Sequence, residues 1–211
     1  ANVFGHWAHD LGLYRFKEFN HEGIPMIIAR MGYSRELCYE IFLQDHSKGD
    51  ELWERLWQAG KDLNISAGGP NIILRLEGGI LSYLADLDRT NNPYEVGLDW
   101  MIDLDQEDDF IGKEALREIN IKGPLKKLMG AEIEGDPIND SNEDHLPVLI
   151  DGKVVGSMNA MVYSPRLDKN LSYVFLDIEH ARVGQEIIIS SPDKDLKAKL
   201  VDLPWLDRAK K

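Results

Sequence analysis

The alternation of apolar and polar residues predicts short β-strands near the start of the chain. Three short runs, each bounded by polar or Gly-containing turns, carry the pattern: Leu13–Phe19, Ile24–Ala29 and Cys38–Leu43. Runs of this length that are rich in β-branched and aromatic side chains are typical of strands. We therefore expect a small sheet in this first segment.

A helical period replaces the alternation in the next segment. Apolar residues recur every three or four positions in Asp50–Leu63, and they include Trp53 and Trp57. This spacing predicts an amphipathic helix with both tryptophans in the core. Ser47 and Asp50 resemble a loose capping box at its start.

A second helix is expected from Ile72 to Leu84, where the apolar residues again follow a helical period. Asn71 is well placed to cap it, because asparagine is a favoured N-cap residue. Gly78 and Gly79 would then lie inside the helix, at a cost of roughly 2 kcal/mol relative to two alanines. We infer that another backbone or a ligand approaches closely at these glycines.

The pattern changes again after a short third helix at Lys113–Glu118, and strands dominate the rest of the chain. They are predicted at Lys127–Ile133, Pro147–Ile150, Lys153–Tyr163, Asn170–Ile178, Glu186–Ser190 and Leu196–Leu203. Asp151-Gly152 is a strong signal for a two-residue hairpin turn. Strands at this spacing indicate a small barrel or sandwich. We expect an α+β chain with a boundary near Lys122-Gly123-Pro124, dividing it into domains 1–122 and 123–211.

Composition narrows the class of protein. Lys plus Arg number 24 and Asp plus Glu number 37, a net charge of −13, so a nucleic-acid backbone would be repelled. The sequence has no apolar run of membrane-spanning length and no secretory leader, so we expect a cytoplasmic protein without a membrane partner. Its one cysteine, Cys38, excludes an internal disulfide. His6 and His9 lack a third metal ligand, and we predict no metal site.

Several segments together resemble the glycine-cleavage T-protein family, in that family's order along the chain. They are Ala29–Ser34 with Cys38-Tyr39-Glu40, Leu74–Glu77 with Leu81-Ser82-Tyr83, Asn92–Leu98, Phe110–Leu116, Gly152–Gly156, Tyr163-Ser164-Pro165 and Leu203-Pro204-Trp205. Each segment is weak by itself, but their common order is specific. The resemblance implies a partial folate-binding domain followed by a C-terminal barrel. It covers the later part of the family's fold, and we expect the first part to be absent from this chain.

Within the family, the residues are similar to the branch that demethylates dimethylsulfoniopropionate. T-proteins usually carry Ala-Arg-Asp before Leu-Arg-Leu-Glu, and that arginine contacts folate. Here the corresponding residues are Pro70, Asn71 and Ile72, as in the demethylase branch. Tyr33 departs from this branch, which has tryptophan at that position.

The resemblance implies that Glu40, Tyr33, Asn71 and Arg75 bind tetrahydrofolate. A carboxylate such as Glu40 can accept two parallel hydrogen bonds from the guanidine-like edge of a pterin. From its pattern alone, Glu40 is more typical of a solvated strand residue, and the resemblance reverses that preference. Tyr33 either stacks on the ligand or packs at the rim, as does Tyr39, and Arg75 either contacts the ligand or has a structural partner.

The reaction implied is methyl transfer from a sulfonium such as dimethylsulfoniopropionate to N5 of tetrahydrofolate. Aminomethyl transfer in the glycine cleavage system, folate-dependent O-demethylation and a non-catalytic folate-binding or regulatory module are the alternatives. The family's catalytic aspartate lies in the early part of the fold, so the catalytic residue of this chain is unknown. We expect this chain alone to be inactive and to bind folate weakly or not at all. The methyl donor and the oligomeric state stay open.

Overall fold

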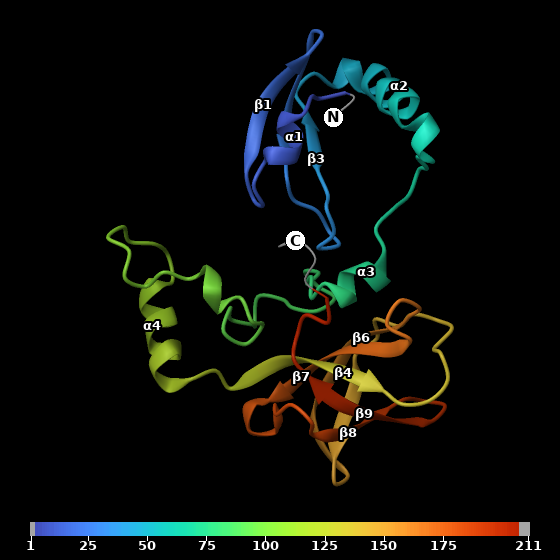
Figure 1. Ribbon diagram of the computed structural model, residues 1–211. Helices are drawn as coiled ribbons and strands as arrows, with labels where there is room; N and C mark the ends of the chain where they lie inside the picture. The colour runs from blue at the N-terminus through green and yellow to red at the C-terminus, as the bar shows by residue number, and fades with distance from the viewer. Residues whose placement is uncertain (1–2, 207–211) are drawn as a thin grey trace. The chain divides into compact units, whose positions relative to one another are not determined.

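The computed structural model describes residues 3–206, and Figure 1 shows its helices and strands. Their contacts define two compact units: the described residues up to Gly78 with Leu206, and Gly79–Trp205. The first unit contains a small sheet and the second contains a barrel. The α+β class is therefore confirmed. The boundary predicted at 122–124 stays a prediction of the sequence.

A three-stranded antiparallel sheet forms the centre of the first unit. Its strands are β1 (Phe16–His21), β2 (Ile24–Ala29) and β3 (Glu40–Leu43), with β2 in the middle. All three predicted strands are confirmed, although β1 and β3 begin later than expected. One face of the sheet is well packed, because its β2 side chains, those of Ile24, Met26 and Ile28, have no exposed surface. The short helix α1 (Trp7–Asp10) also packs against this core.

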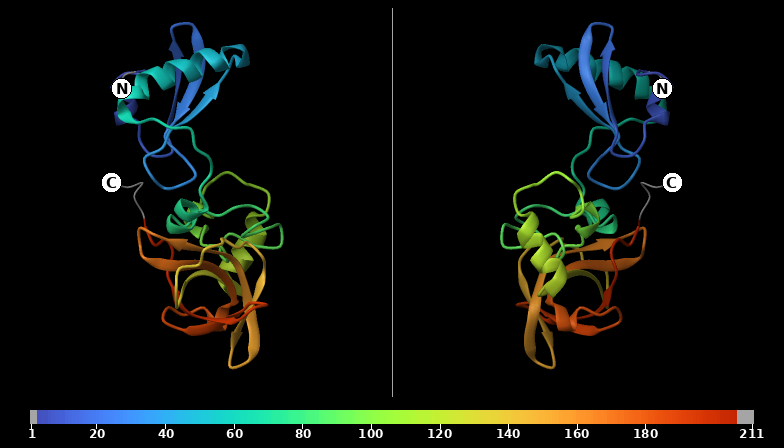
Figure 2. Two further views of the ribbon diagram at one scale, coloured as in Figure 1. Left: turned by 90° about the vertical axis from the view of Figure 1, so that its right-hand side faces the viewer. Right: turned by 90° about the vertical axis from the view of Figure 1, so that its left-hand side faces the viewer.

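Helix α2 (Gly49–Gly60) runs across the sheet in Figure 2 and continues as the 3-10 turn η2 (Lys61–Leu63). Leu52 is buried against the packed face of the sheet. The prediction that both tryptophans belong to the core is wrong, since Trp53 is 58% exposed and Trp57 is 36% exposed. The apolar stripe of α2 is wider than the sheet can cover.

The start of α2 also differs from the prediction. Its N-cap is Lys48, whose side chain makes no capping hydrogen bond, so the capping box expected from Ser47 and Asp50 is wrong. Asp45 instead caps the preceding turn η1 (His46–Lys48) and accepts from the backbone N and Oγ of Ser47 at 3.0 and 2.7 Å. These hydrogen bonds hold the pKa of Asp45 below its ordinary value.

Helix α3 (Ile72–Glu77) is shorter than predicted, because the two glycines end it. Gly78 is the C-cap, and Gly79 has φ +68°, a conformation that favours glycine. A Cβ on Gly78 would lie 3.1 Å from the carbonyl oxygen of Ser34, and one on Gly79 would lie 2.9 Å from Pro204. The expected close approach of another backbone is confirmed, but the expected continuation of the helix is wrong.

The second unit is built on a closed six-stranded barrel. Its strands are β4 (Lys126–Ile133), β5 (Leu146–Ile150), β6 (Lys153–Ser164), β7 (Lys169–Asp177), β8 (Glu186–Ser190) and β9 (Asp195–Val201). They close in the order β4-β7-β6-β5-β8-β9, with β4 paired to both β7 and β9. Met158, Val174 and Leu200 have no exposed surface and lie in the core. The predicted barrel is confirmed.

Turn chemistry sets the register of one barrel hairpin. Asp151 and Gly152 join β5 to β6 and have φ +50° and +74°. Two successive residues with positive φ define the turn that the Asp-Gly pair predicts. The hairpin prediction is therefore confirmed.

A long irregular connection precedes the barrel. It includes η3 (Asp99–Met101) and α4 (Lys113–Lys122), which is longer than predicted, while η4 (Ile178–His180) follows β7. Lys113 is only 6% exposed, and its Nζ donates to the carbonyls of Gln106 and Asp108 at 2.7 and 3.1 Å. The ammonium of Lys113 thereby fixes the loop before α4.

Candidate functional site

The strand register places Glu40 on the face of the sheet opposite the packed core. Glu40 pairs with Ala29, and Ala29 pairs with Phe16. Residues directly opposite one another in antiparallel strands lie on the same face, and the side chains alternate between faces along each strand. The next row on that face is Glu18, Ile27 and Phe42. We call these two rows the Glu40 face.

The Glu40 face combines accessible aromatic rings with two carboxylates, those of Glu40 on β3 and Glu18 on β1. Phe16 is 67% exposed and Phe42 is 51% exposed, while Glu40 is half-buried at the start of β3. Because Phe42 follows Glu40 by two residues, both side chains point to one side of the sheet. A planar ring could therefore contact the aromatic residues while its edge meets the Glu40 carboxylate.

Neither Phe16 nor Phe42 was predicted to be a site residue. The signal that could have found Phe42 is the period of two in Glu40-Ile41-Phe42, which places its ring beside the carboxylate. Phe16 had no such local signal, since its position depends on the pairing of β1 with β2. Only the sheet register brings it to the same row as Glu40.

Tyr33 belongs to the loop that joins β2 to β3, at the end of the sheet where Glu40 lies. It is 42% exposed, so a ligand can reach its ring. The same loop contains Cys38, whose Sγ lies 3.2 Å from Ser34 Oγ. Tyr39 has a structural role instead, because its hydroxyl donates to the carbonyl of Ala8 at 2.7 Å and its ring packs in the core.

Asn71 caps helix α3, as its position in the sequence predicted. Its Oδ1 accepts from the backbone N of Ile73 and Leu74 at 2.9 and 3.2 Å. The residue is exposed. Capping uses the amide oxygen, so Nδ2 is the group with which Asn71 would donate to a ligand.

Arg75 and Glu77 lie on α3 with 2% and 1% of their surface exposed. Neither side chain offers a ligand more than a trace of accessible surface in this structure. The burial of Arg75 in this chain therefore favours the structural alternative, and its contact with folate stays a prediction. Lys122, the last residue of α4, forms an ion pair with Glu118 at 3.1 Å.

Two cavities of similar size have linings that include none of the four residues predicted to bind folate. One of about 400 Å³ in the first unit is lined by Phe4, His9, Leu56 and residues around them. The other, of about 410 Å³, opens between β5 and β8 and is lined mainly by polar surface. Within residues 3–206, no group of three or more His, Cys, Asp or Glu side chains is arranged to hold a metal ion. Nor is any helix in that range long and apolar enough to cross a membrane.

The fold and the two family models define the class of protein. Residues 5–106 match the GCVT N-terminal domain, and residues 126–207 match the glycine cleavage T-protein C-terminal barrel domain. The chain belongs to the glycine-cleavage T-protein family.

Individual relatives refine this class. The chain is 35% identical to dimethylsulfoniopropionate demethylase of Ruegeria pomeroyi, over 92% of this chain and 52% of that protein. It is 33% identical to an aminomethyltransferase of Picosynechococcus, over 97% of this chain and 56% of that protein. The crystal structure of aminomethyltransferase T from Bartonella henselae has the same fold, with a TM-score of 0.82 at 20% identity, over 95% of this chain and 54% of that one. This chain thus spans about half the length of the relatives it matches.

Proposed function

We propose that this chain is part of a tetrahydrofolate-dependent methyltransferase that demethylates a sulfonium such as dimethylsulfoniopropionate. Enzymes of this family use tetrahydrofolate, which supports the folate part of the proposal. The demethylase of Ruegeria pomeroyi, at 35% identity, supports the choice of donor. Asn71, at the position where T-proteins usually carry an arginine, supports the same choice.

The observation that carries the proposal is the Glu40 face. A pterin is flat and presents a row of N–H donors along one edge, so it fits a carboxylate that has an exposed aromatic ring beside it on the same face. Glu40 would accept two parallel hydrogen bonds from that edge, and Phe42 would contact the ring on the same face. Tyr33, at the same end of the sheet, would contribute from the loop. This geometry orients the ring and leaves N5 available to the donor.

The reaction needs little acid–base chemistry. The lone pair of N5 forms a bond to the methyl carbon while the carbon–sulfur bond breaks. Sulfur keeps the electron pair and leaves as a neutral thioether, and N5 then loses its proton to solvent. Because a sulfonium is a good leaving group, the protein contributes chiefly by aligning the two reactants and excluding water. Aromatic rings near the donor would favour its positive charge.

Aminomethyl transfer is the second candidate, because several relatives at 30–33% identity are aminomethyltransferases. In that case the same face would hold folate, while the donor would be an aminomethyl group. Folate-dependent O-demethylation and a non-catalytic folate-binding module remain the further alternatives. We also propose that the protein acts in the cytoplasm on a small-molecule donor, and that it binds neither nucleic acid nor membrane.

A chimera tests the reaction. In it, this chain replaces the matched half of the Ruegeria pomeroyi demethylase, so that the complete family fold is present. The chimera is incubated with tetrahydrofolate and, in separate reactions, dimethylsulfoniopropionate, an aminomethyl donor or an aromatic methyl ether. The proposal predicts 5-methyltetrahydrofolate and a thioether with the sulfonium only. Methylenetetrahydrofolate from the aminomethyl donor would establish the second candidate instead, and no product with any donor would contradict the enzyme assignment.

The role of Glu40 has its own test in the same chimera. Glu40→Gln removes the charge and one acceptor, so tetrahydrofolate should bind about 10- to 100-fold more weakly, as expected for hydrogen bonds to a charged group. Glu18→Gln is the matched control, since Glu18 lies on the same face in the neighbouring row. It should change binding less than about threefold, because a solvated carboxylate contributes little. Equal losses in both variants, measured by isothermal titration, would show that Glu40 acts only through the general charge of the face.

A further inference from the structure

The loop between β2 and β3 is anchored at both of its ends. At its start, the backbone N of Arg30 donates to the carbonyl of Arg15 at 2.9 Å. At its end, the ring of Tyr39 packs in the core of the sheet. We call residues 30–39 the Tyr33 loop, because they present the exposed ring that is expected to contact folate.

Within the Tyr33 loop, the backbone at Gly32 has no room for a side chain. A Cβ on Gly32 would lie 2.4 Å from the Cβ of Cys38 and 3.0 Å from its Sγ. Carbon atoms that are not bonded to each other pack at about 3.5–4.0 Å. The backbone of Gly32 and the side chain of Cys38 therefore fit together only because position 32 is a glycine. A hydrogen bond of 3.2 Å between Cys38 Sγ and Ser34 Oγ spans the same turn.

A second glycine packs against the Tyr33 loop from the end of α3. A Cβ on Gly78 would lie 3.0 Å from the side chain of Arg35 and 3.1 Å from the carbonyl oxygen of Ser34. Arg35 has φ +52°, a left-handed conformation that residues other than glycine adopt uncommonly. Such a conformation persists where the surrounding structure holds it. Both neighbours of Tyr33 in the sequence, Gly32 and Ser34, are thus fixed by packing.

We propose that these two glycine contacts hold Tyr33 in place for tetrahydrofolate before the ligand binds, which makes Gly32 and Gly78 positioning residues of the site. The inference rests on the proposed function, because the contact of Tyr33 with folate belongs to it. A loop that is already ordered spares the ligand the cost of ordering it, and preorganisation of this kind strengthens binding. On an unsupported loop, the same ring would have to be immobilised by the ligand.

Moving a Cβ from one side of the Gly32 contact to the other tests the positioning. In the chimera with the Ruegeria pomeroyi demethylase, Gly32→Ala should weaken tetrahydrofolate binding about tenfold, as expected when loop residues must be ordered on binding. The φ of Gly32 lies outside the left-handed region, so alanine is disfavoured there only by the clash with Cys38. Cys38→Gly opens the contact without a clash and should weaken binding less. The double variant again has one Cβ at the contact, so its binding should recover toward that of wild type.

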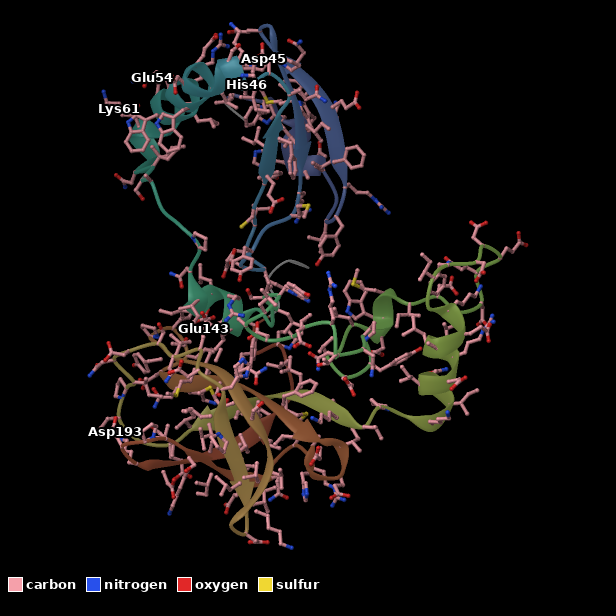
Figure 3. All side chains as sticks on the ribbon, turned by 180° about the vertical axis from the view of Figure 1, so that it is seen from behind. Asp45, His46, Glu54, Lys61, Glu143 and Asp193 are labelled. Atoms are coloured by element: carbon pink, nitrogen blue, oxygen red, sulfur yellow. The ribbon has the colours of Figure 1, made fainter. Side chains whose placement is uncertain are left out.

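Two other alanine variants complete the comparison. Gly78→Ala brings a Cβ against the carbonyl oxygen of Ser34 and should weaken binding in the same direction. Gly60→Ala is the matched control at the end of α2, next to Lys61, which Figure 3 labels. The atoms nearest to its added Cβ all belong to Ile65, at 2.8–3.0 Å, so the clash is of the same kind in the same unit. Its Tm, measured by circular dichroism, should fall while tetrahydrofolate binding stays at the wild-type value.

The Tyr33→Ala background shows whether the effect acts through that ring, because Gly32→Ala should then cause no further loss of binding. The proposal is overturned if Gly32→Ala binds as wild type, if the double variant binds no better than Gly32→Ala, or if Gly60→Ala loses as much. A further loss in the Tyr33→Ala background would overturn it too. A wild-type chimera that binds no tetrahydrofolate refutes the proposed function as well, whereas the other results refute the positioning role alone.

Discussion

Replacing Asn71 separates its capping role in α3 from the contact with folate that we propose for it. Its Oδ1 accepts two backbone N–H groups at the start of α3, at 2.9 and 3.2 Å. Asn71→Ala removes this acceptor, and loss of an N-cap of this kind costs about 1 kcal/mol. For a chain of this size that corresponds to a fall in Tm of about 2–4 °C. Asn71→Asp keeps the acceptor, so the Tm should stay close to that of wild type.

Thermal unfolding of the chain, monitored by circular dichroism, measures how much the cap stabilises it. Tetrahydrofolate binding to the chimera measures the contact with folate, since Asn71→Asp lacks the Nδ2 donor while keeping the cap. If Nδ2 donates to folate, Asn71→Asp should bind more weakly at unchanged stability. The capping argument is refuted if Asn71→Ala melts with the wild type, or if Asn71→Asp loses as much stability as Asn71→Ala.

Two further predictions concern packing in the second unit. A Cβ on Gly156 would lie 2.1 Å from the carbonyl oxygen of Phe175, so Gly156→Ala should destabilise the barrel by about 3 kcal/mol. The free energy of unfolding is measured in urea, with Gly68→Ala as the control, because nothing lies within 4 Å of a Cβ at that position. An equal loss of stability in Gly68→Ala would contradict the steric explanation. Lys113→Met removes the donor to two carbonyls, so amide exchange in residues 104–112 should accelerate, with a stability loss of about 2 kcal/mol. Lys122→Met, at an exposed position on the same helix, should leave both measurements unchanged. Equal acceleration of amide exchange in Lys122→Met would show that the hydrogen bonds of Lys113 do not fix this loop.

Local chemistry predicted much of the fold. Asn71 as an N-cap and Asp151-Gly152 as a hairpin turn depend on neighbours in the sequence, and both are confirmed. The capping box expected at Ser47 is wrong because Asp45 accepts from the Ser47 amide and caps the start of turn η1. Helix α3 stops at Gly78 because other backbone segments approach the glycines there, and no local pattern reveals that contact.

The candidate site was predicted only in part, because its geometry depends on strand pairing. Glu40 could be proposed from a resemblance, but Phe16 reaches the same row only through two successive strand registers. Burial could not be predicted for the tryptophans of α2, since a helical period identifies an apolar stripe and not what covers it. Leu52, on the same helix, is buried because it faces the sheet.

The barrel and the three-stranded sheet differ in whether their strands have unpaired edges. In the closed barrel each strand pairs on both sides, whereas among the described strands β1 and β3 each pair only with β2. Unpaired edges can recruit strands from other molecules, and closure removes that route. Aggregation of this chain during heterologous expression should therefore begin in the first unit. Designers who want a soluble fragment should place charges on the outer edge of β1 rather than alter the barrel.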